Sequence, residues 1–221
     1  MSSDVVGVNP QVINNYIENL QTNFQAVHNN LTELVHAGFA LEYEGPDAAD
    51  HFNPGLRRVM ENLLAGTHET MEAYATAVGT VTSNIASALG QSGVQTVRYV
   101  PPPIELPAAP GLVANDFRID LRAFQQYVNE ILPQSKRTVS QLVEQNRSLI
   151  SGISRSGAGM GWAGQSRDLV ESQIVPRQVE NMSHAISTGM TNIEQFIDQA
   201  ITRASAADGR DGGAASLGGI S

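Results

Sequence analysis

The sequence predicts an all-α protein with four long helices in two helix–turn–helix hairpins, which form an antiparallel four-helix bundle as a single-chain pseudo-dimer. Three observations support this prediction. Apolar residues recur at helical spacing in four long stretches, no stretch alternates convincingly enough to be a strand of any length, and a proline-rich segment separates two halves of the same plan. With 221 residues the chain can bury a real core.

Changes in composition divide the chain. We expect the first hairpin at residues 1–90, a proline-rich linker at 91–114, the second hairpin at 115–206 and a disordered tail at 207–221. The tail is mostly glycine, alanine and serine with little apolar surface to bury, which is typical of disorder.

The first helix is expected to begin after Asn9, which can cap it, with Pro10 at its first position, and to stop near Gly38. Its apolar residues are separated by alternating steps of four and three, which is the spacing of a heptad seam. They are Ile13, Ile17, Leu20, Phe24, Val27, Leu31 and Leu34.

The second helix is expected over residues 47–89. Its apolar seam is Phe52, Leu56, Val59, Leu63, Met71, Tyr74, Val78, Val81 and Ile85. The phase of this seam slips around Gly66 and Thr67, which indicates a stutter in the packing. Pro54 and Gly55 lie near the helix start and predict an irregular first turn or two.

The third helix is expected to have its cap at Asn115 or Asp116, and Pro133 should kink it in the preceding turn. Its seam is Phe117, Leu121, Phe124, Val128, Ile131, Val139, Leu142, Leu149 and Ile153. The fourth helix is expected over residues 165–206, with a second kink at Pro176. Its inward residues are Leu169, Val179, Ile186, Met190, Ile193 and Ile197.

The linker contains "QSGVQTVRYVPPPIELPAAPG", whose five prolines exclude a helix and favour an extended chain. We interpret it as a linker, with a docking motif for a proline-binding module as the alternative. About 24 extended residues reach roughly 75 Å, whereas a helix of about 38 residues spans roughly 57 Å. The linker can therefore run the full length of the bundle, as an antiparallel arrangement of the hairpins requires.

The turn inside each half carries an aromatic residue two positions before a glycine. The first turn is "HAGFALEYEGPDAAD" and the second is "SGAGMGWAGQSRDLV". Aligning them places Tyr43 on Trp162 and Gly45 on Gly164. A hairpin alone cannot bury its apolar seam, so the repeat predicts that the two hairpins pack together. The aromatic residues can close the ends of the bundle, and the glycines allow sharp turns.

In these turns and the long heptad helices around them, the chain resembles the WXG family of helical-hairpin proteins exported by type VII (ESX) secretion systems. It is most similar to members of the early-secreted-antigen type, which have about half this length and pair as antiparallel dimers. The resemblance covers residues 9–90 and 115–206, so the chain looks like two such units fused. The second turn carries the full motif, Trp162-Ala163-Gly164, and the first has Tyr43 in place of tryptophan.

The resemblance implies a non-enzymatic protein that acts by protein–protein recognition. The turn residues Tyr43, Gly45, Trp162 and Gly164 would contribute to a surface recognised by the secretion ATPase or by co-secreted proteins. It also implies secretion, or association with the cell envelope, without a general secretory signal, and the N-terminal residues show no such signal. The alternative is a non-exported, cytoplasmic helical adaptor or chaperone for a larger effector.

Pairs in this family usually carry a Tyr-X-X-X-Asp/Glu signal just after the last helix of one partner. No such signal follows the last expected helix here. The residues four positions after Tyr74, Tyr99, Tyr127 and Phe196 are Val78, Pro103, Ile131 and Ala200. Three alternatives follow: the protein travels with another substrate, it uses a degenerate signal, or it is not exported.

Composition excludes several other functions. A net charge of −9 without a basic stripe argues against nucleic acid, and no apolar run approaches the roughly 18 residues of a membrane span. The absence of cysteine excludes disulfides and thiolate metal sites. A small-molecule binding bundle is disfavoured because few aromatic or polar groups are expected to converge inside it.

We find no catalytic, cofactor or metal site in the sequence. The histidines show no close ligand spacing; they are His28, His36, His51, His68 and His184. Asp47 and Asp50 precede His51, but acidic residues near a helix N-terminus need no metal to explain them. The glycines between Gly157 and Gly164 follow no strand and precede no Lys-Ser/Thr pair, so they do not form a phosphate loop.

Overall fold

The structure is a computed structural model that describes residues 7–88, 90, 93–95, 99–107, 118–153 and 161–216, with side chains as far as residue 206. Its elements are β1 (Gly7–Val8), α1 (Pro10–Phe39), β2 (Tyr43–Glu44), η1 (Ala48–Phe52), α2 (Asn53–Ala88), β3 (Arg118–Ile119), α3 (Leu121–Gln126), η2 (Tyr127–Ile131), α4 (Leu132–Ser151), β4 (Trp162–Ala163), α5 (Gln165–Leu169), η3 (Val170–Ile174) and α6 (Val175–Ser216). The elements labelled η are single π-helical turns. The predicted all-α fold is confirmed.

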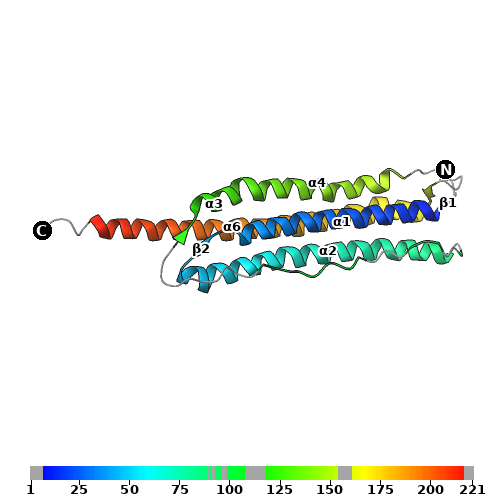
Figure 1. Ribbon diagram of the computed structural model, residues 1–221. Helices are drawn as coiled ribbons and strands as arrows, with labels where there is room; N and C mark the ends of the chain where they lie inside the picture. The colour runs from blue at the N-terminus through cyan, green and yellow to red at the C-terminus, as the bar shows by residue number, and fades with distance from the viewer. Residues whose placement is uncertain are drawn as a thin grey trace.

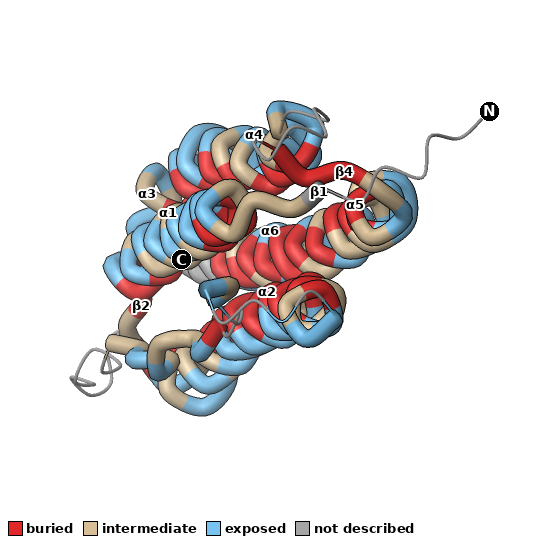
Figure 2. Tube along the Cα trace, turned by 90° about the vertical axis from the view of Figure 1, so that its right-hand side faces the viewer, coloured by how far each residue is buried: buried red, intermediate tan, exposed pale blue. Residues whose placement is uncertain are grey.

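Four long helical rods lie side by side around one core (Figures 1 and 2). The first hairpin consists of α1 and the η1–α2 rod, and the second of the α3–η2–α4 and α5–η3–α6 rods. Viewed along the bundle, the buried residues face inward from all four rods. None of the helices in the described ranges has the length and apolar character needed to cross a lipid bilayer.

The two hairpins are antiparallel, as predicted. Asn23 Nδ2 in α1 donates to Asn146 Oδ1 near the end of α4, at 2.7 Å. Tyr127 Oη, near the start of the α3–η2–α4 rod, donates to Leu34 O near the end of α1, at 3.1 Å. The first helix of each hairpin therefore runs in the opposite direction to the first helix of the other, which places the two turns at opposite ends of the bundle (Figure 1).

The first hairpin follows its predicted seams closely. All seven expected seam residues of α1 are buried, and α1 begins at Pro10 after the Asn9 cap. The phase slip in the second seam is filled by Thr67, which is fully buried and whose hydroxyl is satisfied by donating to Leu63 O at 2.8 Å. The seam is therefore continuous through the predicted stutter.

The first helix ends at Phe39, one residue after Gly38, close to the stop that the sequence predicts. A Cβ at Gly38 would lie 2.4 Å from Met60 Cε and 3.2 Å from Tyr127 Oη. Gly38 therefore also allows close packing of α1 against α2 and η2 near the end of the helix.

The irregularities expected at three prolines occur as the three π turns. Each π turn ends two residues before a proline, which is Pro54, Pro133 or Pro176. The residue just before each proline donates its N–H to the carbonyl five residues earlier, as Leu132 does to Tyr127 O. Since proline has no N–H and its ring clashes with the carbonyl four residues back, a wider turn relieves the conflict.

The π turns shift the phase of the seams in the second hairpin. The expected inward residues Ile131 and Leu169 are 36% and 39% exposed. Leu132 and Val170, one position later, are buried in their place. Other residues that we expected in the third seam are only half-buried: Leu121, Val128, Leu142, Leu149 and Ile153. The predictions for Ile131 and Leu169 are wrong because a π turn adds one residue and a heptad pattern does not continue through it.

The third helix begins later than expected. Asp120 is its cap, with Oδ1 accepting from the N–H groups of Arg122 and Ala123 at 3.1 Å. The two preceding residues pair as strand β3, so the helix cannot start before them. The expected caps Asn115 and Asp116, and the seam residue Phe117, lie outside the described residues.

The fourth rod continues beyond its expected end. Its inward residues Val179, Ile186, Met190, Ile193 and Ile197 are buried as predicted. The backbone of α6 remains helical to Ser216, where we expected a disordered tail from residue 207. Adding residues to an established helix costs less than starting a new one, so α6 extends into this segment although it contains three glycines, which are weak helix formers.

The described part of the linker, residues 93–95 and 99–107, is an extended strap along the first hairpin (Figure 1). At one end Asn14 Nδ2 donates to Gly93 O at 2.9 Å, and Asn14 Oδ1 accepts from Gln95 N at 2.8 Å. At the other end Arg57 donates to Pro107 O at 2.7 Å. The strap therefore spans the bundle from the start of α1 to the start of α2.

Candidate functional site

The two predicted hairpin tips are built into reciprocal two-residue sheets. Strand β2 at the first tip pairs with β3, which precedes the second hairpin, and Tyr43 lies opposite Ile119. Strand β4 at the second tip pairs with β1, which precedes the first hairpin, and Trp162 lies opposite Val8. The strand at each tip thus pairs with the strand that directly precedes the other hairpin.

The hydrogen bonds around the two tips repeat as well. The residue before each tip aromatic accepts from the cap of the opposing hairpin: Gly161 O from Asn9 N at 2.9 Å, and Glu42 O from Asp120 N at 3.3 Å. This agreement extends the aligned repeat from the sequence to the backbone and to both helix caps.

The tip glycines adopt the conformation that their alignment predicts. Gly45 has φ of 116° and Gly164 has φ of 106°. Side-chain-bearing residues rarely adopt these angles, so each position requires glycine for the chain to turn from strand to helix. In both turns the glycine carbonyl accepts from the N–H four residues later, at Ala49 and Asp168.

Trp162 is fully buried at the second tip. Its ring packs edge-on against Tyr16 at a centroid distance of 6.2 Å, and its indole N–H donates to Ser166 Oγ at 3.2 Å. The side chain therefore points into the bundle and closes its end, as the structural interpretation of this residue requires.

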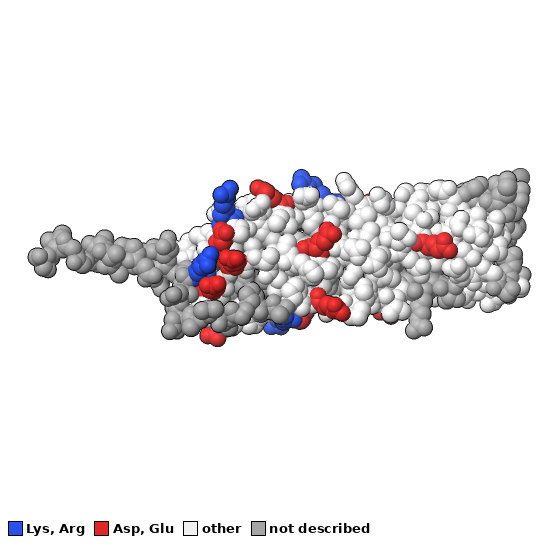
Figure 3. Space-filling view, in the orientation of Figure 1, with Lys and Arg blue, Asp and Glu red and all other residues white. Residues whose placement is uncertain are grey.

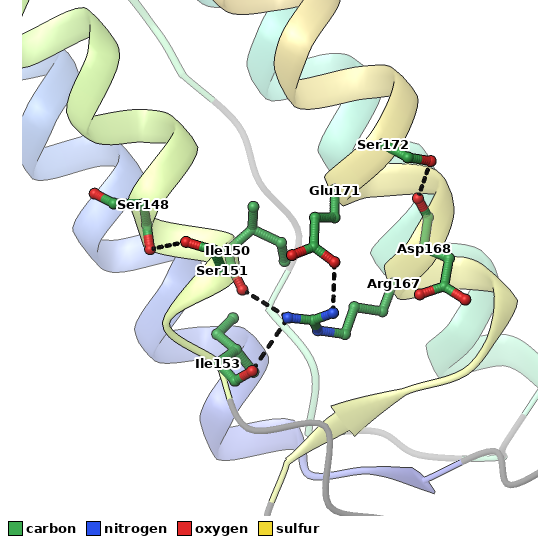
Figure 4. Close-up of polar contacts among 8 residues, drawn as sticks. All are labelled: Ser148, Ile150, Ser151, Ile153, Arg167, Asp168, Glu171 and Ser172. Atoms are coloured by element: carbon green, nitrogen blue, oxygen red, sulfur yellow. Dashed lines mark hydrogen bonds and ion pairs between the residues drawn. The ribbon is translucent and has the colours of Figure 1, made fainter.

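A buried arginine lies beside this tip (Figure 4). Arg167 is 1% exposed and pairs with Glu171 Oε2 at 2.6 Å. Its other terminal nitrogen donates to Ile150 O and Ile153 O, at 3.1 and 3.2 Å. These carbonyls lie in the last turn of α4 and just after it, so Arg167 caps one helix of the hairpin from the other.

Tyr43 is 3% exposed at the first tip, in a cluster of aromatic rings. Its ring contacts Phe52 at 5.1 Å and Phe124 at 6.2 Å. Its hydroxyl donates to Asp47 Oδ2 at 2.5 Å, and Asp47 Oδ1 lies 3.7 Å from Arg203. Burial, and then the Asp47 carboxylate, raise the pKa of Tyr43 above its usual range.

The surroundings of the two tips differ in charge. The exposed pair Arg118–Glu42, at 3.6 Å, and the half-exposed pair Arg203–Asp47 lie around the first tip. On the face shown in Figure 3, charged atoms gather toward that end, and fewer are visible toward the end of the second tip. At the second tip, by contrast, the ion pair of Arg167 with Glu171 has its guanidinium buried.

A Tyr-X-X-X-Asp/Glu spacing does occur in the chain, at the first tip rather than around the later aromatic residues. Tyr43 and Asp47 have this spacing, in "YEGPD", and they are hydrogen-bonded. The pair lies at the first tip rather than after the last helix, and Tyr43 is buried. It therefore differs in position and accessibility from the signal that the resemblance implies.

The structure brings together two histidines that the sequence leaves apart. His28 Nδ1 in α1 lies 2.9 Å from His68 Nε2 in α2. Burial lowers the pKa of both, and the neighbouring His28 lowers the pKa of His68 further, to about 4. Only the register between two helices creates this pair, so no spacing along the sequence indicates it.

No cluster of three or more metal-ligating side chains occurs in the described part of the chain, around Asp47, Asp50 and His51 or elsewhere. Searches against protein-family models, curated proteins and solved structures give no match to this chain. The tips therefore stand as the candidate site on their repeated geometry alone.

Proposed function

We propose that this chain is a non-enzymatic protein of a type VII secretion system that acts by protein–protein recognition as a fused pair of WXG-like hairpins. The observation that supports this most is the reciprocal holding of Tyr43-Glu44-Gly45 and Trp162-Ala163-Gly164 by the opposite hairpins. If the two hairpins were separate chains, they would need the same strand pairing to assemble. Their fusion in one chain fixes the ratio of the two hairpins at one to one.

Since both tip aromatics are buried, a secretion ATPase or a co-secreted protein would contact their exposed neighbours. Leu169 lies on the helix that follows the second tip and is 39% exposed. Asp168 beside it is also exposed. The indole of Trp162 would then act indirectly, by fixing the start of α5 that presents these residues.

Export can be tested in the source organism by deleting the gene for the secretion ATPase. The chain should disappear from the culture filtrate and accumulate in the cells, and unchanged secretion would contradict the proposal. The variant Leu169→Glu should reduce export. Ile131→Glu is its matched control, because Ile131 is similarly exposed but lies in η2, outside both tips.

The second candidate function is a non-exported adaptor or chaperone for a larger effector. It is favoured by the burial of Tyr43, which is the tyrosine of the Tyr-X-X-X-Asp spacing at the first tip. It predicts that the chain co-purifies from cell lysate with one larger protein and that loss of the secretion ATPase leaves its location unchanged. An ATPase-dependent presence in the filtrate would exclude it.

A further inference from the structure

The outer groove of the first hairpin, between α1 and α2, is already filled. The strap runs along it, and Tyr99 of the strap packs edge-on against Phe24 at 5.2 Å. Past Tyr99, on its way to Arg57, the strap passes the level of the hydrogen-bonded pair His28 and His68. This groove therefore holds an extended, proline-rich segment of the chain itself.

The second hairpin has an equivalent groove between α4 and α6. Ser187 follows the tip glycine Gly164 by as many residues as His68 follows Gly45, and each intervening helix contains one π turn. Ser187 therefore occupies in α6 the place that His68 occupies in α2.

The facing helix gives the same correspondence. Ser140 follows the cap Asp120 by one residue more than His28 follows the cap Asn9. The additional residue is the one that the π turn η2 introduces into this rod. Two serines thus stand where the first hairpin has two histidines.

Smaller side chains leave a crevice in the second groove. It has a volume of about 240 Å³ and is lined by Ser140, Ser187 and Ser183 above buried apolar residues. The apolar residues are Val139, Val143 and Ile186. The volume suits one or two amino-acid side chains, and the hydroxyls can bond to a peptide backbone.

Lys136 lies at this crevice and is the only lysine in the chain. Counted from the helix caps, it takes the place of Phe24, on which Tyr99 of the strap packs. It is exposed, and no carboxylate of the described residues pairs with it. In the first groove, the aromatic ring of Phe24 is contacted by an aromatic residue of the strap. In the second groove, the cation Lys136 at the equivalent position favours a carboxylate in the bound segment.

We propose that the α4–α6 crevice binds an extended apolar peptide segment of a partner protein, with a carboxylate of that segment against Lys136. The first hairpin provides the precedent, since the equivalent groove binds an extended segment of this chain. The proposal does not depend on export, and its test uses purified protein only.

The probes are two labelled peptides with the sequence of residues 93–107, one carrying Tyr99→Glu and the other Tyr99→Lys. Fluorescence anisotropy with the full chain should show about tenfold tighter binding of the glutamate peptide, because opposite charges attract and like charges repel across the crevice. The variant Lys136→Glu should reverse this preference. Ser187→Phe, which fills the crevice, should weaken binding of both peptides about tenfold or more.

Circular dichroism melting checks that the variants fold, which is expected because Lys136 and Ser187 are exposed. If Ser187→Phe does not fold, Ser140→Phe fills the same crevice from the other helix. Equal affinity for both peptides, an unchanged preference in Lys136→Glu, or no binding of either peptide at millimolar concentration would each overturn the proposal.

Discussion

The two hairpins share a backbone plan but fill equivalent places with different chemistry. At the first tip Tyr43 lies among aromatic rings beneath exposed ion pairs, whereas at the second Trp162 lies beside the buried Arg167. The first hairpin has a pair of imidazoles between α1 and α2, whereas the second has serines and a lysine at the equivalent positions. The glycines, helix caps and π turns thus give the two hairpins the same backbone. The side chains at equivalent positions differ in size, charge and hydrogen-bonding groups.

Replacing the aromatic residue of each tip by alanine should produce the largest difference in stability between the two tips. Trp162→Ala should lower the free energy of unfolding by about 3–5 kcal/mol, because removing a fully buried indole ring leaves a large cavity. Tyr43→Ala should cost about 2–3 kcal/mol, since the ring removed is smaller and the surrounding rings can close in. Urea denaturation measures both. A larger loss for the Tyr43 variant would reverse the comparison.

The buried arginine gives the next largest effect. Glu171→Gln should cost about 2 kcal/mol, because the guanidinium of Arg167 stays buried while its carboxylate partner is removed. Its matched control is Glu144→Gln, which breaks the pair with Arg147 at 2.9 Å on the exposed surface of α4. That control should cost less than about 0.5 kcal/mol. Similar losses for the two variants in urea denaturation would contradict a special role of the second tip.

The histidine pair should make the first hairpin sensitive to acid. The pKa of His68 is lowered to about 4, so below pH 6.5 the unfolded chain binds a proton that the folded chain does not. Stability is therefore complete above pH 6.5 and falls as the pH decreases toward 4, by about 1–2 kcal/mol from this pair.

The matched variant is His28→Ser with His68→Ser, which copies the second hairpin. Urea denaturation at pH 7.5 and pH 4.5 should show that the wild type loses about 1–2 kcal/mol more than this variant. Equal losses would show that the pair does not respond to acid, because the carboxylates that titrate in the same range are common to both proteins.

The smallest expected effect concerns the connection between the hairpins. Cleavage at a protease site inserted within residues 108–117 should leave the two halves associated, because both tips and the helix seams join them. Size-exclusion chromatography should give one peak at the mass of the uncleaved chain. Two separate peaks would show that the linker is needed to hold the halves together.

The sequence predicts the fold well where the helical phase is uninterrupted. Every expected seam residue of α1 is buried because that helix contains no π turn. The heptad pattern wrongly predicts Ile131 and Leu169 to be in the core, because Ile131 ends one π turn and Leu169 directly precedes another, where the pattern shifts by one position. The prolines signal the irregularity, but the choice between a kink and a π turn depends on packing against the other rods.

The candidate site was predictable in its backbone and not in its contacts. The aligned aromatic-X-Gly steps predict both turns, and Gly45 and Gly164 adopt matching conformations. Nothing along the sequence indicates that Arg167 reaches the end of α4 or that His28 meets His68. Such contacts depend on the register between helices, which hydrophobic spacing alone leaves open.

The pairing of β1 with β4 has a consequence for the order of folding. During synthesis, β2 can pair with β3 as soon as the first residues of the second hairpin have been made. β1 can pair with β4 only after Trp162 has been made. Closing such a long loop is slow and entropically costly. The N-terminal end of the nascent chain therefore stays open longest, and the last contact to form seals the end that Trp162 closes.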